Sequence, residues 1–191
     1  GREADDREDL ALLAAIRAET ARLSRIAEQY LGIARRPAPT LEPESVADIV
    51  RELVAFLKPE HERANVKVEL RIDEKAPEVP VDEAQLRQAL LNLVRNAREA
   101  MPEGGTLGLE VTAGEGGGVV LTIEDDGVGI PDDVRSSVFD PFFTTKQRGT
   151  GLGLAVTREI IEAHGGHIAC EGRKPKGTRF RIALPGASSS P

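Results

Sequence analysis

Two asparagines four positions apart, Asn92 and Asn96, stand in an otherwise largely apolar stretch of helical pattern. Residues at this spacing lie on the same face of a helix, so the two amides should point the same way. Amide oxygens suit Mg²⁺, a hard cation that usually keeps several waters and takes phosphates as its other ligands. The pair is therefore a candidate magnesium and phosphate site. The alternative is a pair of polar residues at the edge of a buried helix.

A carboxylate and two glycines follow a strand that is apolar up to its end: Asp125, Gly127 and Gly129. A carboxylate in this place can accept a hydrogen bond from an exocyclic amine such as that of adenine. Glycine lets the backbone approach a flat base closely. An ordinary Asp-Gly turn would contain the same residues, so this motif carries weight only together with the others.

A run of alternating glycines opens a helix further along the chain. Backbone amides at a helix start, with glycines that permit close approach, form a cradle for an anion. No Gly-Lys-Ser/Thr follows, so the run is not a Walker loop. It is not a dinucleotide fingerprint either, because a loop rather than a strand precedes it. The residues predicted to contact phosphate are Gly149, Thr150, Gly151, Leu152, Gly153 and Leu154.

The loop before this run is rich in phenylalanine. Three of the five Phe in the chain lie within five residues, at Phe139, Phe142 and Phe143. Loops seldom carry aromatic residues without a functional or anchoring reason. We expect them to anchor a mobile lid and Lys146 to reach a phosphate; the alternative is a local hydrophobic plug beside a solvated lysine.

The elements that position these residues follow from hydrophobic periodicity and turn residues. We expect Asp82 to cap a helix and Gly165-Gly166 to end one. A glycine-rich hairpin tip spans 114–118, and residues 127–150 form a long loop. Helices are predicted over 42–63, 83–101 and 151–164, and strands over 66–72, 106–113, 119–125, 167–172 and 178–184.

An amphipathic helix is predicted over residues 3–36, with apolar or small residues at alternating steps of three and four. Such a helix needs a partner helix from a second copy or a missing segment; the alternative is packing on its own domain. Pro37-Ala38-Pro39 ends it. We therefore predict a helical segment over 1–37, a single domain over 38–186 and a disordered tail over 187–191.

Composition excludes several classes of function. The chain has 191 residues, of which 40% are hydrophobic, which allows one domain with a core plus an appendage. Its net charge of −7 argues against a nucleic-acid-binding face. Cys170 is the only cysteine, which excludes an internal disulfide and fits a reducing compartment. No apolar run approaches about 20 residues, so we expect no membrane contact.

In their order along the chain, these motifs resemble the N box, first glycine box, F box and second glycine box of histidine-kinase ATP-binding domains. Residues 177–180 followed by Leu184-Pro185 resemble the last glycine-box strand, and the match covers about residues 41–185. Ser136-Ser137 and the run Thr144-Thr145-Lys146 are similar to the short lid of nitrogen-regulation sensors. The resemblance implies the Bergerat ATP-binding fold: an α/β two-layer sandwich whose mixed, mostly antiparallel sheet carries three helices on one face. In this chain one long helix precedes it.

The same resemblance implies ATP and Mg²⁺ as cofactors and gives roles to individual residues. Asn96 would be the Mg²⁺ ligand, and Asn92 would lie near the metal and phosphates. Asp125 would bind the adenine amine, Thr178 would lie near the base, and the run over 149–154 would contact phosphate.

One position departs from the family pattern. Many relatives carry Lys or Arg three residues after the second asparagine, where this chain has Glu99. Neutralisation of the phosphates is therefore expected to depend on Lys146 or Arg148.

The first asparagine separates a histidine kinase from other users of this fold. Gyrase-type, mismatch-repair and chaperone ATPases and anti-sigma-factor serine kinases typically carry Glu where this chain has Asn92. Glutamate can act as a general base on water or a serine hydroxyl, and an amide cannot. Two alternatives remain: a degenerate ATP-binding module that docks a partner through its helix, and an ATPase or serine kinase.

The phosphorylated histidine is expected to lie on a segment outside this chain, so no catalytic residue is assigned. His164 and His167 flank a turn, and no Thr-Pro-Leu follows His61-Glu62-Arg63 as an acceptor motif would require. The segment over 1–37 resembles the second helix of a dimerisation hairpin. We expect a homodimer through this helix, relay to a response regulator, and a cytoplasmic location, with any membrane anchor elsewhere in the parent protein.

Overall fold

The computed structural model describes residues 17, 20, 37–146 and 149–187. The chain divides into two units, Gly1–Pro37 and Ala38–Pro191. The helix expected over 3–36 lies outside the described residues except at Arg17 and Thr20, and the expected tail does so except at Ala187.

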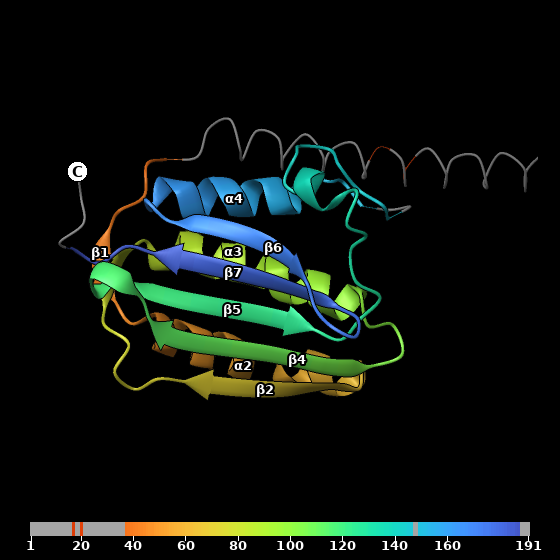
Figure 1. Cartoon of the computed structure of the whole chain (residues 1–191), viewed down its shortest axis with the longest axis horizontal. Helices are drawn as coiled ribbons and strands as arrows, with labels where there is room; N and C mark the ends of the chain where they lie inside the picture. The colour runs from red at the N-terminus through yellow and green to blue at the C-terminus, as the bar shows by residue number, and fades with distance from the viewer. Residues whose placement is uncertain (1–16, 18–19, 21–36, 147–148, 188–191) are drawn as a thin grey trace, which may run out of the picture. The chain divides into compact units, whose positions relative to one another are not determined.

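A five-stranded mixed sheet forms one layer of the second unit (Figure 1). β2 runs parallel to β4, and the other neighbouring pairs are antiparallel. The expected mixed, mostly antiparallel sheet is therefore confirmed. The strands in spatial order are β2 (Val66–Ile72), β4 (Gly105–Ala113), β5 (Val119–Asp125), β7 (Thr178–Leu184) and β6 (His167–Gly172).

Three helices cover one face of this sheet, as Figure 1 shows, and form the second layer: α2 (Val46–Arg63), α3 (Glu83–Glu99) and α4 (Gly153–Ala163). Along β5 buried apolar residues alternate with half-buried ones, the pattern of a sheet with one face against a core. The core between the layers consists mainly of Leu, Ile and Val. The two-layer sandwich is confirmed. Within the described residues, none of the helices has the length and apolar character needed to cross a bilayer.

The start of the helix expected over 42–63 is instead a short strand. β1 (Glu42–Glu44) pairs antiparallel with β3 (Val79–Val81) in a separate two-stranded sheet. α2 begins after Ser45, whose side chain accepts a hydrogen bond from the Asp48 amide at 3.2 Å. An N-cap residue has extended rather than helical backbone angles, so Ser45 separates the strand from the helix.

Asp82 joins three segments of the domain. It caps α3 as expected, because its side chain accepts from the Gln85 amide at 3.0 Å, and it also accepts from the Thr40 amide at 3.1 Å. Its own amide donates to Nε2 of the buried His164 at 2.9 Å, just after α4. The opposite ring nitrogen, Nδ1, therefore carries the proton and donates to the Ile160 carbonyl at 2.7 Å.

The long loop before α4 is anchored at its base by one phenylalanine. Phe139 is buried, and its ring meets that of Phe180 edge-on with centroids 6.2 Å apart. Phe142, by contrast, has 54% of its surface exposed. The loop includes the short turn η2 (Arg135–Ser137). α4 begins at Gly153 rather than at 151, since Gly151 has a φ of +69° that ends any helical path there.

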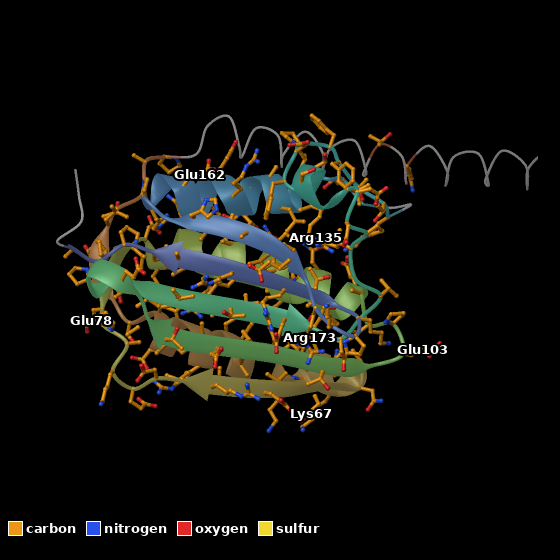
Figure 2. The ribbon with its side chains drawn as sticks, in the orientation of Figure 1. Lys67, Glu78, Glu103, Arg135, Glu162 and Arg173 are labelled. Atoms are coloured by element: carbon orange, nitrogen blue, oxygen red, sulfur yellow. The ribbon has the colours of Figure 1, made fainter. Side chains whose placement is uncertain are left out.

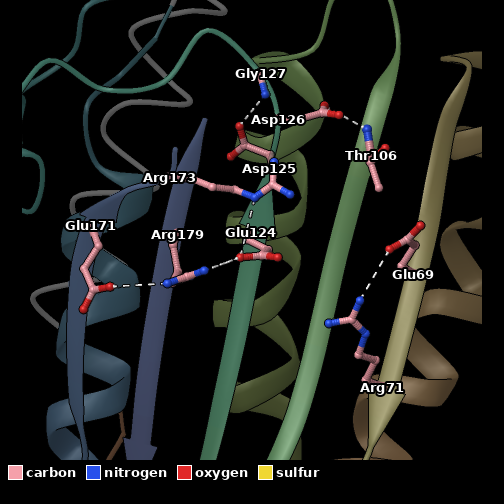
Figure 3. A network of polar contacts seen from close by, with 10 residues as sticks. All are labelled: Glu69, Arg71, Thr106, Glu124, Asp125, Asp126, Gly127, Glu171, Arg173 and Arg179. Atoms are coloured by element: carbon pink, nitrogen blue, oxygen red, sulfur yellow. Dashed lines mark hydrogen bonds and ion pairs between the residues drawn. The ribbon is translucent and has the colours of Figure 1, made fainter. Parts of the chain in front are cut away.

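The face of the sheet opposite the helices is polar. Arg179 donates from Nε and Nη2 to Glu124 Oε2 at 3.0 and 2.9 Å, and Arg173 Nε lies 3.7 Å from the same oxygen. Lys67 pairs with Glu69 at 2.8 Å on the edge strand. Figure 2 shows Lys67 and Arg173 on this face, and Figure 3 shows the ion pairs across it. Positive and negative groups alternate here and pair with each other.

Candidate functional site

A side chain of α3, which carries the two asparagines, contacts a backbone carbonyl at the start of α4, where the glycine run ends. Asn92 on α3 directs its side-chain nitrogen at the Gly153 carbonyl, 3.4 Å away, and Thr157 Oγ1 donates to the same oxygen at 2.9 Å. Asn92 and Gly153 are 61 residues apart in sequence. The first asparagine therefore lies beside the start of α4, as a shared site for metal and phosphate requires.

The second asparagine binds the lysine of the Phe-rich loop. Lys146 Nζ donates to Asn96 Oδ1 at 2.9 Å and pairs with Glu99 Oε2 at 2.5 Å. Both partners lie on the same face of α3, one turn apart. Arg148, the other cation expected near the phosphates, lies outside the described residues.

Asp125 is a buried carboxylate at the end of β5. Only 3% of its surface is exposed, and its Oδ1 accepts from the Gly127 amide at 2.9 Å (Figure 3). Burial raises the pKa of Asp125, while hydrogen bonds from the Gly127 and Thr178 backbone oppose the rise. Thr178 is itself 3% exposed at the start of β7. The structure thus brings Asp125 and Thr178 together, as the resemblance implied for two residues near a base.

Asp126, the neighbouring carboxylate, has a structural role that sequence reasoning missed. Its Oδ1 accepts from the Thr106 amide at 2.8 Å, which ties the loop after β5 to the start of β4 (Figure 3). Successive side chains of a strand point to opposite faces. That alternation is the signal from which the separate roles of Asp125 and Asp126 could have been found.

The glycines after Asp125 have close protein neighbours. A Cβ on Gly127 would lie under 3.0 Å from the Ala100 carbonyl at the end of α3, and the Val128 amide donates to that carbonyl at 3.0 Å. Gly129 has a φ of +78° and lies against the backbone of Gly177. Both positions require glycine for packing within the fold; their approach to a base stays a prediction.

The glycine run leaves open space where α4 starts. Gly151 packs against the Phe142 backbone, and the Phe142 amide donates to the Gly151 carbonyl at 3.0 Å. A Cβ on Gly153, in contrast, would meet nothing within 4 Å. Leu152 is buried and can offer only its backbone to a ligand. The remaining members of the run are half-buried: Gly149, Thr150 and Leu154.

The donor groups around this space suit a nucleotide and a divalent cation. The first amides of an eleven-residue helix have no partners within the helix and attract an anion. Two hard oxygens, from Asn96 and Glu99, converge on one ammonium group. No cluster of three or more His, Cys, Asp or Glu suited to a metal occurs among the described residues. Phosphates would therefore have to complete the coordination of Mg²⁺.

Two of the three histidines are poorly placed to receive a phosphoryl group because they are buried. Of the three, His61 is 3% exposed within α2, and His164 is 2% exposed with both ring nitrogens bonded. His167 is exposed at the start of β6. His164 therefore has a structural role, and the burial of His61 gives no support to its being a phosphate acceptor.

A family model describes the larger part of the chain. Residues 81–188 match "Histidine kinase-, DNA gyrase B-, and HSP90-like ATPase". The chain is also 35% identical over 170 residues to sporulation kinase E of Bacillus subtilis (strain 168). That alignment covers 89% of this chain and 23% of the relative, so the chain corresponds to less than a quarter of that kinase.

Solved structures agree in fold. The nucleotide-free catalytic domain of the histidine kinase ThkA has a TM-score of 0.70 and 32% identity, over 76% of this chain and 95% of that domain. ThkA in complex with the response regulator protein TrrA has a TM-score of 0.77 and 28% identity, over 90% of this chain and 49% of that chain. Full-length ShkA in complex with AMPPNP has a TM-score of 0.78 and 26% identity, over 95% of this chain and 39% of that chain.

Proposed function

The chain belongs to the family of histidine kinase-, DNA gyrase B- and HSP90-like ATPases, and we propose that it transfers the γ-phosphate of ATP to a histidine located outside it, as the catalytic region of a sensor kinase. The observation that carries the proposal is the meeting of Asn92 and the start of α4 at the Gly153 carbonyl. An amide, rather than a carboxylate, therefore lies beside the start of α4, where the proposal puts the phosphates.

An amide at this position suits a kinase whose acceptor is already a nucleophile. Asn92 cannot remove a proton from water or a serine hydroxyl, whereas a glutamate can. An imidazole nitrogen carries a free lone pair and can attack phosphorus directly once a neighbouring group sets its tautomer. The chain then has to hold and orient ATP but need not supply a base.

Different residues of the site bind different parts of ATP. Asp125 accepts a hydrogen bond from the adenine amine, and Thr178 lies at its side. The open space at Gly153 receives phosphates, which the first amides of α4 bind. Asn96 would hold Mg²⁺, which would supply positive charge to neutralise the phosphates. Lys146, released from α3, reaches the same phosphates.

The wider assignment concerns the parent protein. ThkA forms a complex with a response regulator, and we infer that the parent of this chain also passes its phosphoryl group to such a protein. The segment over 1–37 is proposed to form a homodimer through its heptad-like stripe. A cytoplasmic location accords with the use of ATP and with a single unpaired cysteine.

The test is incubation with γ-labelled ATP and Mg²⁺, first with this chain alone and then with its native upstream helix supplied. We expect label only when the helix is present, lost in acid and retained in base, as for phosphohistidine. Acid-stable label on this chain alone would point to a hydroxyl acceptor and refute the role given to Asn92. Release of phosphate without any acceptor would indicate an ATPase, and absence of ATP binding a docking module.

A further inference from the structure

At the end of α3, the resemblance assigns a metal to Asn96 but gives no role to Glu99, and the structure joins both side chains to Lys146. Lys146 Nζ lies 2.9 Å from Asn96 Oδ1 and 2.5 Å from Glu99 Oε2. The ammonium comes from a loop about fifty residues further along the chain, so this is a long-range contact rather than a local helix pair. We propose that Asn96 and Glu99 together bind a cation, which is the Lys146 ammonium without nucleotide and Mg²⁺ when ATP is bound.

The chemistry of the two oxygens supports this exchange. Carboxylate and amide oxygens are ligands for Mg²⁺ as well as acceptors for an ammonium group. Mg²⁺ binds oxygen at about 2.0–2.1 Å, so the two side chains have to draw in by less than about 1 Å or coordinate through a retained water. Asn96 and Glu99 are one helical turn apart on the same face, which makes such an adjustment possible without moving α3.

The charges explain why the site should be filled in both states. A bare carboxylate at Glu99 would repel the phosphates of ATP, since both are negative. Lys146 removes that repulsion before metal binds. The side chains of Lys146 and Glu99 are 45% and 52% exposed, and exposed ion pairs are weak, so a divalent cation can displace the ammonium. Glu99 thus becomes a ligand in place of the Lys or Arg found in many relatives.

This inference depends on the proposed function, because it requires the chain to bind ATP with Mg²⁺. The measurement is equilibrium binding of a fluorescent non-hydrolysable ATP analogue to the whole chain while Mg²⁺ is titrated. Its readout is the Mg²⁺ concentration at half-maximal binding, recorded separately from the affinity at saturating Mg²⁺. The variants are Glu99→Gln and Lys146→Met, each at an exposed position, with thermal unfolding to verify folding. Glu103→Gln removes the same charge from an exposed carboxylate just beyond α3 and is the matched control.

The two variants should shift the midpoint in opposite directions. Glu99→Gln removes a charged ligand and should raise it on the order of tenfold, the lower end of the cost of disturbing a metal site. Lys146→Met removes the competitor and should lower it by up to about fivefold. Glu103→Gln should change it by less than about twofold. Any loss of phosphate pairing by Lys146→Met appears in the affinity at saturating Mg²⁺ and leaves the sign of the midpoint shift readable.

Other results would overturn the inference. If Glu99 only holds Lys146 in place, both variants free Asn96 and lower the midpoint together. An unchanged midpoint in Glu99→Gln would exclude Glu99 as a ligand. Both results leave the proposed function intact, because nucleotide still binds. Failure of the unaltered chain to bind nucleotide at any Mg²⁺ concentration would refute the proposed function and this inference with it.

Discussion

Replacing Asp125 with Asn should weaken nucleotide binding while stabilising the fold. Gly127 donates its amide to Asp125 Oδ1 at 2.9 Å, and the Thr178 backbone also donates to this carboxylate, so an amide oxygen should stay turned toward these two donors. In the Asn variant the amide oxygen takes this place, and the NH₂ group then faces the position proposed for the adenine amine. Two donors meet, and a charge-assisted hydrogen bond worth about 1.5–3 kcal/mol is lost. Nucleotide affinity should fall roughly 10- to 150-fold.

The effect on stability has the opposite sign and depends on pH. Burial raises the pKa of Asp125, so the folded chain binds its proton more tightly than the unfolded chain does. The stability associated with that proton is fully present below the unfolded pKa, about 3.9, and is lost as pH rises through the raised pKa. Asn carries no charge to bury. Asp125→Asn should therefore be more stable than the parent at pH 8, and the difference should shrink as pH falls toward 4.

Two assays and one control variant test the predicted changes in nucleotide affinity and in stability. Nucleotide affinity is measured by titration calorimetry, and stability by urea unfolding at several pH values between 4 and 8. Asp126→Asn is the control, because its oxygen can still accept from the Thr106 amide and it lies on the opposite side of the strand end. Unchanged affinity in Asp125→Asn would refute the contact with adenine. A less stable variant at pH 8 would refute the argument from burial.

Three further predictions concern other parts of the domain. His164→Ala leaves the Asp82 amide without a partner and removes the ring's hydrogen bond to the Ile160 carbonyl, which keeps only the backbone amide of residue 164, so it should cost about 2–4 kcal/mol in urea unfolding; an unchanged midpoint would mean that water replaces the ring. Gly151→Ala places a Cβ under 3.0 Å from the Phe142 backbone at a φ of +69°, so it should lose about 1–2 kcal/mol of stability and at least about tenfold in nucleotide affinity. Partial burial raises the pKa of Cys170 to about 11, so alkylation at pH 8 should be about a hundredfold slower than in urea, and equal rates would contradict the raised pKa.

Sequence reasoning located the main strands because runs of apolar and β-branched residues lie between glycines, prolines and charged residues. β5, β6 and β7 begin and end where the pattern predicted, at positions marked by glycine or by charged residues. β1 was missed because it is three residues long and its partner, Val79–Val81, lies in a distant segment. A short strand held by a non-local pair leaves no periodic signal of its own.

Within the site, the order of the motifs predicted which residues matter but not how they meet. The approach of Asn92 to Gly153 depends on α3 and α4 packing side by side, which sequence spacing does not encode. Glu99 was recognised as a departure from the family pattern, yet its contact with Lys146 depends on the path of a long irregular loop. Loop conformation is the part of a structure that hydrophobic patterning constrains least.

The hydrogen bonds of Asp82 give the domain a mechanical coupling point. Thr40, three residues beyond Pro37, is held by the same side chain that caps α3, and the backbone of Asp82 is held by the histidine that follows α4. A pull or twist at Thr40 is therefore passed by these hydrogen bonds to the start of α3 and to the residue that follows α4, as well as along the chain into β1.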